Sequence, residues 1–211
     1  MDSEKQMGFW RKLWWFIWED NSVWSWIANV VIAFVLIKFV IYPGLGLLLG
    51  TGYPIVAVVS SSMEHDGSFD EWWSRQYCCL DAGCSRRISP ADIYSSYGIS
   101  RDNFKGFPFK NGFNKGDIMI LRGPKELAVG DILVYWTDTR NEPIIHRVVQ
   151  VMGVAGDRTY KTKGDRNCGS ADFEQGIGSD RMIGKAVIRV PFLGWIKIGF
   201  VELLKLSGLV S

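Results

Sequence analysis

Three consecutive serines, Ser60, Ser61 and Ser62, follow directly after an apolar run. In an extended strand alternate side chains share a face, so Ser60 and Ser62 would point to one side and Ser61 to the other. That arrangement suits a nucleophilic serine beside a second hydroxyl that stabilises a developing oxyanion. Serine clusters are also common in polar loops, so this stretch indicates catalysis only if the chain supplies a base.

A serine attacks only when another group takes its proton, usually a histidine or a lysine. The chain has two histidines. His65 comes three residues after Ser62 and would sit in the turn that follows it. His146 lies within "EPIIHRVVQVMG", a run rich in β-forming residues. A strand histidine can be purely structural, but His146 is the one histidine on a predicted strand, so we favour it as the base.

Candidate acids that could orient this histidine lie in "TKGDRNCGSADFEQG", residues 162–176. Asp165 is part of a Gly-Asp pair and Asp172 follows further along. Gly-Asp is also ordinary turn chemistry, and the chain has three other such pairs. A structural role is therefore an equal alternative for each aspartate taken singly.

The elements that would hold these groups begin with an aromatic N-terminus. Residues 1–22 include "GFWRKLWWFIWED", which at helical spacing would lie along a membrane surface. Residues 23–42 are apolar apart from Lys38, and about 20 such residues cross a bilayer. The run is too long for a cleaved signal peptide, so we predict an uncleaved anchor. Positive residues precede it, which predicts a cytoplasmic N-terminus and an extracytoplasmic remainder.

From residue 43 to 190 the pattern changes to short runs with period two, separated by Gly-Asp, Gly-Pro and Asn-Glu-Pro turns. Many short strands without an intervening helical pattern predict a mostly β domain. Residues 66–114 break the rhythm and are interpreted as an irregular insertion, with one short helix near "SPADIYSSYG". Residues 191–211 are apolar but carry charges, which favours a membrane-associated helix over a second span.

Composition excludes several other classes of protein. The net charge is +2, and no basic run is present that a nucleic-acid backbone would need. We predict no metal and no cofactor, because neither histidine has metal-ligand spacing and no C-x-x-C pair occurs. The chain has four cysteines, Cys78, Cys79, Cys84 and Cys168. They could be buried thiols or form disulfides, and their spacing does not show which of them would pair.

Five motifs follow one another along the chain: the anchor, "SSSME", a "GDI" strand, "IHRV" and "KGDRN", with "VPFLGWI" after them. This order closely resembles type I signal peptidases of the archaeal and endoplasmic-reticulum branch, which uses histidine. The resemblance covers roughly residues 23–65 and 115–200. It implies a signal-peptidase-like β-strand domain behind an N-terminal transmembrane helix.

The resemblance also implies roles for matching residues. Ser62 would be the nucleophile, Ser60 would support the oxyanion and His146 would be the base. Asp165 matches an aspartate that is important for activity.

A second aspartate of the family normally follows six residues after Asp165 and orients the histidine. Ala171 occupies that position here, so we expect Asp172 to act, with Asp180 as the alternative. Two further departures are His65, where the family has proline, and the insertion of about fifty residues.

The predicted function is a membrane-bound serine endopeptidase that removes signal peptides from exported preproteins after small residues. Its partners would be those signal peptides, membrane lipid and the secretion machinery. We expect it in the cell membrane, with the catalytic domain on the extracytoplasmic side. Two alternatives stay open. One is a protease of the same fold that uses Lys115 or Lys163 as the base. The other is a catalytically inactive membrane-anchored β module.

Overall fold

The computed structural model describes residues 8–79, 86–123, 126–138, 140, 142–196 and 198–200. The chain divides after Leu48 into two compact units, residues 1–48 and 49–211. Each unit is described by itself.

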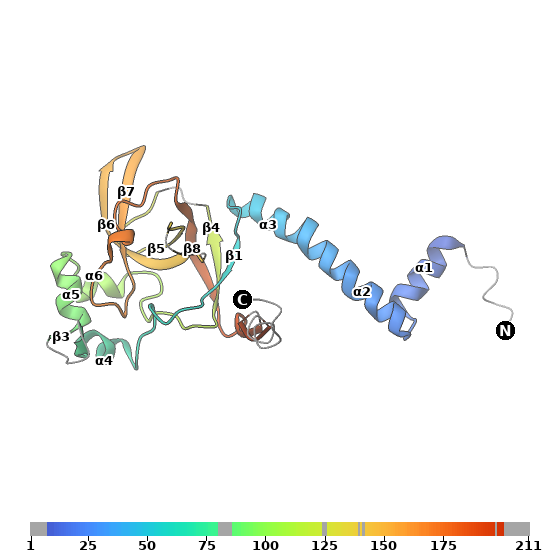
Figure 1. The fold of residues 1–211 in the computed structure, drawn as a ribbon, viewed down its shortest axis with the longest axis horizontal. Coiled ribbons are helices and arrows are strands. Elements are labelled where there is room, and N and C mark those ends of the chain that lie inside the picture. Colours follow the sequence, from blue (N-terminus) through green and yellow to red (C-terminus); the bar gives the residue numbers. More distant parts are fainter. Residues whose placement is uncertain are drawn as a thin grey trace. The chain divides into compact units, whose positions relative to one another are not determined.

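The first unit is helical (Figure 1). Helix α1 (Phe9–Trp18) is followed by α2 (Val23–Leu36), whose N-cap Ser22 accepts a hydrogen bond from the backbone N–H of Ser25. The side chains of Ser25 and Asn29 in α2 donate to the last carbonyls of α1, those of Phe16 and Ile17. These bonds satisfy carbonyl groups that a helix end would otherwise leave without partners.

The helix that starts at α2 runs on without a break through a π-helix (Ile37–Ile41) into α3 (Tyr42–Leu49). Over Val23–Leu49 it is long and apolar enough to cross a membrane, as the sequence predicted for residues 23–42. The predicted span ended at Tyr42, but in the structure the helix continues to Leu49, about two further turns. Pro43 has no N–H to donate, and the wider π turn lies directly before it.

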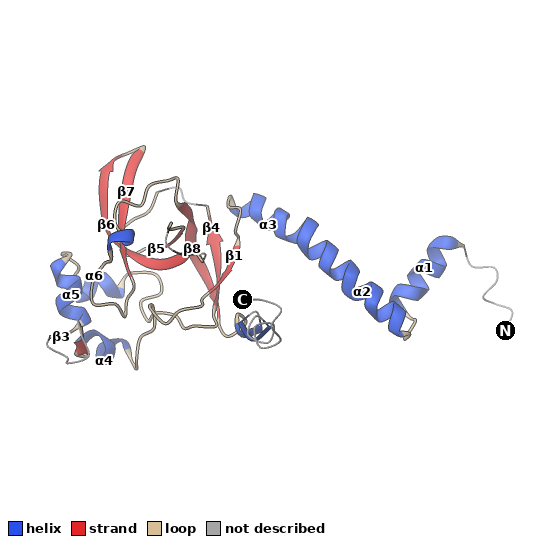
Figure 2. Cartoon of the chain, viewed as in Figure 1, coloured by secondary structure: helices blue, strands red, loops and turns tan. Residues whose placement is uncertain are grey.

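The second unit is built on a six-stranded antiparallel sheet with the order β1-β4-β8-β5-β6-β7 (Figure 2). Its strands are β1 (Ile55–Ala57), β4 (Ile118–Arg122), β5 (Ile132–Tyr135), β6 (Ile144–Val154), β7 (Asp157–Lys163) and β8 (Met182–Val190). Each corresponds to one of the short runs with period two, so the predicted mostly β fold class is confirmed. β1 lies at an edge of the sheet.

Two apolar clusters hold the sheet together. One packs Val58, Met63 and Phe113 against the buried faces of β4, β5 and β8, and the other lies between β5, β6 and β7 around Tyr135 and Tyr160. Met63 is fully buried. Because Met63 follows Ser62 directly, the first cluster fixes the backbone at the serine triplet.

The insertion, residues 66–114, folds into short elements on one side of the sheet (Figure 1). They are α4 (Phe69–Ser74), β2 (Tyr77–Cys78), β3 (Arg87–Ile88), α5 (Pro90–Ser96) and α6 (Arg101–Lys105). All three helices begin with a serine capping box, whose serine bonds the backbone three residues on. The one predicted helix corresponds to α5, while α4 and α6 were missed.

A disulfide joins Cys79 of the insertion to Cys168 in the loop after β7. Cys84 lies outside the described residues, so no pairing is assigned to it. The predicted C-terminal segment, residues 191–211, is described only to residue 200 and is helical at 195–196 and 198–200.

Candidate active site

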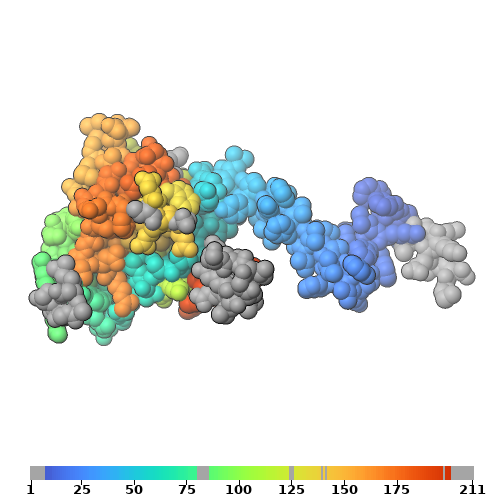
Figure 3. Space-filling view, in the orientation of Figure 1, coloured from blue at the N-terminus to red at the C-terminus, as the bar shows by residue number. Residues whose placement is uncertain are grey.

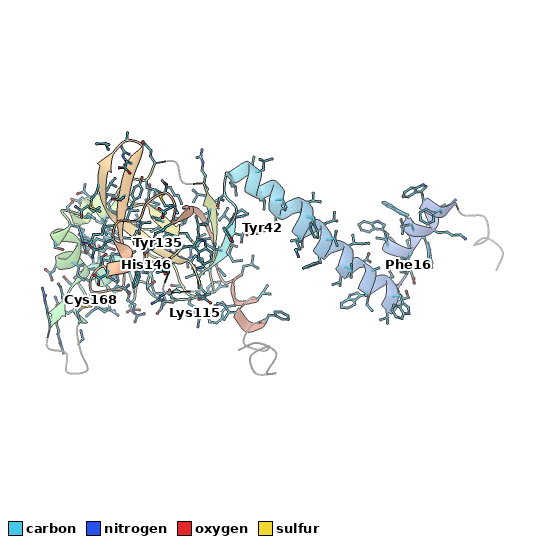
Figure 4. All side chains as sticks on the ribbon, turned by 45° about the horizontal axis from the view of Figure 1, so that its top comes forward. Phe16, Tyr42, Lys115, Tyr135, His146 and Cys168 are labelled. Atoms are coloured by element: carbon cyan, nitrogen blue, oxygen red, sulfur yellow. A yellow bond between two sulfur atoms is a disulfide. The ribbon has the colours of Figure 1, made fainter. Side chains whose placement is uncertain are left out.

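Ser62 and His146 meet although 84 residues separate them. The chain leaves β1 through Val58, which is buried, and turns at Ser62. His146 is the third residue of β6 and lies inside the β unit (Figure 4). Its Nε2 atom is 2.8 Å from Ser62 Oγ. This is the hydrogen bond through which an imidazole can accept the hydroxyl proton of a serine.

The other imidazole nitrogen contacts a glutamate that was not among the predicted site residues. His146 Nδ1 bonds Glu174 Oε1, and the glutamate side chain is 1% exposed. Its second oxygen, Oε2, accepts the backbone N–H of Ala171 at 2.6 Å. Glu174 closes the 3-10 turn Asp172–Glu174, so the turn itself holds the carboxylate in place. A carboxylate on Nδ1 keeps the proton there and leaves Nε2 free to accept one.

The aspartates that were expected at this nitrogen lie elsewhere. Asp172 starts the same 3-10 turn but is exposed, and Asp180 is also exposed. Neither contacts His146 in the part of the chain that the structure describes. In the structure, therefore, Glu174 takes the place expected for Asp172. No spacing in the sequence singles out Glu174, because a capping box begins with serine or threonine and Ala171 stands at that position.

The hydroxyl of Ser60 lies 3.1 Å from that of Ser62. Both hydroxyls therefore lie on the same side of the chain, although residues 60–62 form a bend and a turn after β1 and not the extended strand that was predicted. Among the described residues, no protein acceptor is found for the backbone N–H of Ser62. This N–H and the Ser60 hydroxyl are donors that could face a charged oxygen bound beside Ser62.

Asp165 lies behind the site and does not contact His146. Burial would raise the pKa of this carboxyl, but Arg147 and a hydrogen bond from His65 outweigh burial and hold the pKa well below its usual value. Arg147 donates to both carboxylate oxygens, at 2.9 and 2.8 Å. Tyr94 of α5 adds a third donor at 2.6 Å. Asp165 is therefore an ionised and fully paired group.

The loop after β7 packs closely against both Ser62 and His146. A Cβ atom at Gly164 would come within 2.9 Å of His146 Nε2, so only glycine permits this approach. The backbone N–H of Arg166 donates to the carbonyl oxygen of Ser62 at 2.8 Å. One loop thus holds the serine backbone and, through Glu174, the imidazole.

The two lysines considered as alternative bases point elsewhere. Lys163 is fully buried, and its Nζ donates to the carbonyl oxygens of Gly164 and Asp165. Burial lowers the pKa of Lys163 to about 8. Lys115 Nζ lies over the ring of Trp195, 5.7 Å from its centre. Neither ammonium contacts Ser62 among the described residues.

A cleft of about 710 Å³ opens at the serines. Figure 3 shows the three segments that form it meeting on one face of the unit: teal near residue 60, yellow near 140 and orange near 170. The cleft is lined by apolar residues, among them Ala57, Ile144 and Phe173, and by polar ones such as Arg166 and Asn167. Among the described residues, no group of three or more potential ligands that could hold a metal ion is found.

No protein-family model matches the chain. It is 35% identical over 94 residues to the signal peptidase complex catalytic subunit SEC11 of Colletotrichum graminicola. This match covers 41% of this chain and 55% of that relative. The SEC11 of Neurospora crassa is 32% identical over 94 residues, with the same coverage. The chain therefore spans about half the length of these relatives.

The SEC11 catalytic subunit of Lachancea thermotolerans is matched over more of its length. It is 33% identical over 118 residues, which is 47% of this chain and 70% of that relative. The predicted kinship with type I signal peptidases is confirmed, while the archaeal label stays a prediction. The chain belongs to the SEC11 family of signal peptidase complex catalytic subunits, a type I signal peptidase-like family.

Proposed function

We propose that this protein is a membrane-anchored serine endopeptidase that removes signal peptides by means of Ser62, His146 and Glu174. The observation that carries the proposal is the continuous chain of hydrogen bonds from Ser62 Oγ to His146 Nε2 and from His146 Nδ1 to Glu174. It has the order nucleophile, base and orienting acid of a catalytic triad. An inactive β module would have no need of this geometry beside an open cleft.

In the first chemical step Ser62 Oγ attacks the scissile carbonyl carbon while His146 Nε2 takes the hydroxyl proton. Glu174 stays ionised and stabilises the imidazolium that forms. His146 then gives the proton to the leaving amine, and the acyl group remains on Ser62. A water molecule, deprotonated by the same Nε2, hydrolyses that ester and restores the free serine.

Negative charge develops on the carbonyl oxygen during each attack. The Ser60 hydroxyl and the backbone N–H of Ser62 are the donors we assign to it. Removing one such donor usually costs about 10²–10³ in kcat. Asp165 takes no part in proton transfer in this proposal, and Asp172 and Asp180 have no catalytic role.

The substrate would bind as an extended strand in the cleft. β1 is an edge strand, and the pairing of β6 with β7 begins only at Arg147. Residues 144–146 and Ala57 both line the cleft, and each segment has a backbone edge that pairs with no strand among the described residues. A peptide between them would gain main-chain hydrogen bonds from both sides.

The catalytic unit would lie on the extracytoplasmic side of the membrane that Val23–Leu49 crosses. Two observations support this placement. Positive residues precede the span, which favours a cytoplasmic N-terminus. The disulfide between Cys79 and Cys168 is typical of an oxidising compartment. As the SEC11 relatives are named as subunits of a signal peptidase complex, we extend partner subunits and signal-peptide substrates to this chain as part of the proposal.

The test is cleavage of a preprotein by the full chain in detergent micelles, with product N-termini determined by sequencing. We expect the wild type to cut after a small residue at the end of the signal peptide, and Ser62→Ala to have no activity above background. Equal cleavage by both proteins would overturn the proposal.

The lysine alternative is separated by a second variant. His146→Ala removes the proposed base and leaves Lys163 and Lys115 in place, so we expect activity at neutral pH to fall by at least about 10³-fold. Activity within tenfold of the wild type would instead support a lysine base.

A further inference from the structure

The insertion reaches the catalytic unit through a buried tyrosine. Tyr94 of α5 is fully buried in an aromatic cluster with Trp72, Trp73 and Phe104. Its hydroxyl donates to Asp165 Oδ1 at 2.6 Å. Burial and the charge of Asp165 both raise the pKa of the Tyr94 phenol, so the hydroxyl stays protonated and able to donate.

A second residue links the same carboxylate to the insertion. His65 Nε2 lies 2.8 Å from Asp165 Oδ2, and the His65 ring stacks on Trp72 of α4 with centroids 3.5 Å apart and planes at 6°. A proline at this position would have neither the N–H nor the flat aromatic ring. The departure from the family pattern at His65 and the presence of the insertion are therefore physically connected.

Apart from Tyr94, the side chains that bond the Asp165 carboxylate lie close to a catalytic group along the chain. His65 is three residues from Ser62, and Arg147 follows His146 directly. Asp165 itself follows Gly164, the residue that packs against the imidazole. Arg147 also contacts the insertion, with its guanidinium over Phe104 and hydrogen bonds to the carbonyls of residues 108 and 109.

The disulfide adds a covalent link on the same side. Cys79 lies one residue after β2, and Cys168 lies six residues before Glu174. Figure 4 shows Cys168 on the side of the β unit where the insertion lies. The insertion is thus joined to the segments of all three groups of the Ser62, His146 and Glu174 triad.

We infer that Tyr94 is a positioning residue for the peptidase reaction, and that the insertion acts as a brace which fixes Ser62 and His146 through Asp165. The inference rests on the proposed function. Tyr94 touches no reacting atom and acts through Asp165. The other hydrogen-bond partners of Asp165 are His65, in the turn after Ser62, and Arg147, on the strand that carries His146. A displacement of about 1 Å between reacting groups can cost about 10²-fold in rate, so a partial loosening has a measurable effect.

The direct test is Tyr94→Phe in the full chain, which removes one hydroxyl and keeps the ring in the aromatic cluster. The matched control is Tyr77→Phe, because Tyr77 also belongs to the insertion but its hydroxyl faces Asp66 at 3.4 Å. Single-turnover cleavage of a preprotein is measured well below the unfolding temperature. We expect the rate to fall about tenfold for Tyr94→Phe with KM unchanged, and to stay within twofold for Tyr77→Phe.

The outcomes are distinguishable from failure of the proposed function. If the wild type cleaves no faster than Ser62→Ala, the peptidase proposal itself is wrong. If the wild type cleaves and Tyr94→Phe matches its single-turnover rate, the brace is wrong, even if the unfolding temperature has dropped.

A second pair of variants covers the case in which Tyr94→Phe fails to fold. His65→Gln keeps an N–H that can reach Asp165, whereas His65→Leu has none. We expect the glutamine variant to retain at least five times the single-turnover rate of the leucine variant. Equal rates in two folded variants would contradict the inference.

Discussion

Two neighbouring residues of β6 serve two different networks. His146 faces the cleft and bonds two side chains, Ser62 and Glu174. Arg147 points to the opposite face, has no exposed surface and donates to Asp165 and to three backbone carbonyls. The alternation of a strand thus places a reactive group and a fully paired charge side by side in sequence.

The two networks differ in whether all of their polar groups are paired within the protein. The Arg147–Asp165 pair is closed, because every strong donor and acceptor has a partner and no water or substrate has to enter. The His146 network is open at Ser62, whose hydroxyl must remain free to attack. A closed buried ion pair can fix the geometry of the open one, but it contributes no proton transfer of its own.

The largest expected effect is a difference between the two networks in how much the free energy of unfolding falls when one of their residues is replaced. Arg147→Met leaves the Asp165 carboxylate buried and without its cation, so we expect a loss of about 3–5 kcal/mol in the free energy of unfolding. Ser62→Ala, at the open end of the other network, leaves no buried charge without its partner and should change it by less than about 1 kcal/mol. Thermal unfolding in micelles compares them, and equal losses would mean that the networks do not differ as described.

A smaller effect is expected at the mouth of the open network. Ser60→Ala removes one proposed oxyanion donor and keeps the backbone unchanged, so we expect kcat to fall about 10²-fold with little change in KM. Ser61→Ala, the matched change at the neighbouring position, should stay within about threefold. If both variants kept wild-type kcat, the Ser60 hydroxyl would have no part in catalysis.

The smallest effect concerns Lys163, which lies between the two networks. Because its pKa is about 8 in the folded chain, the unfolded chain binds more protons between pH 8 and 10.5. Stability therefore rises with pH in that window. Relative to Lys163→Met, the wild type should gain on the order of 2 kcal/mol between pH 7 and pH 10. A difference that is independent of pH would show that Lys163 stays charged.

The sheet could be predicted because its strands show period two and lie between recognisable turns. The short helices of the insertion were harder, since each is too short to show an apolar stripe. Their signal was present in the capping boxes that start at Ser68, Ser89 and Ser100, with an acid or amide three residues later. The burial of Trp72 and Tyr94 against Asp165 depends on tertiary packing, which no local pattern contains.

Within the site, Ser62 and His146 were named from ordered motifs, and the structure brings them within hydrogen-bonding distance. The orienting carboxylate was predicted at an aspartate of the motif, whereas in the structure Glu174 contacts His146. A glutamate has one more methylene than an aspartate and can reach Nδ1 from the end of a 3-10 turn. Spacing alone could not distinguish the exposed Asp172 from the buried Glu174, two residues apart on that turn.

The most direct test of the account compares these two carboxylates in the full chain. Glu174→Gln keeps the shape of the side chain but removes the charge that stabilises the imidazolium, whereas Asp172→Asn makes the same chemical change on an exposed side chain. We predict a fall in kcat of at least about 10²-fold for Glu174→Gln and a change within threefold for Asp172→Asn. A large loss for Asp172→Asn together with near wild-type kcat for Glu174→Gln would contradict the account.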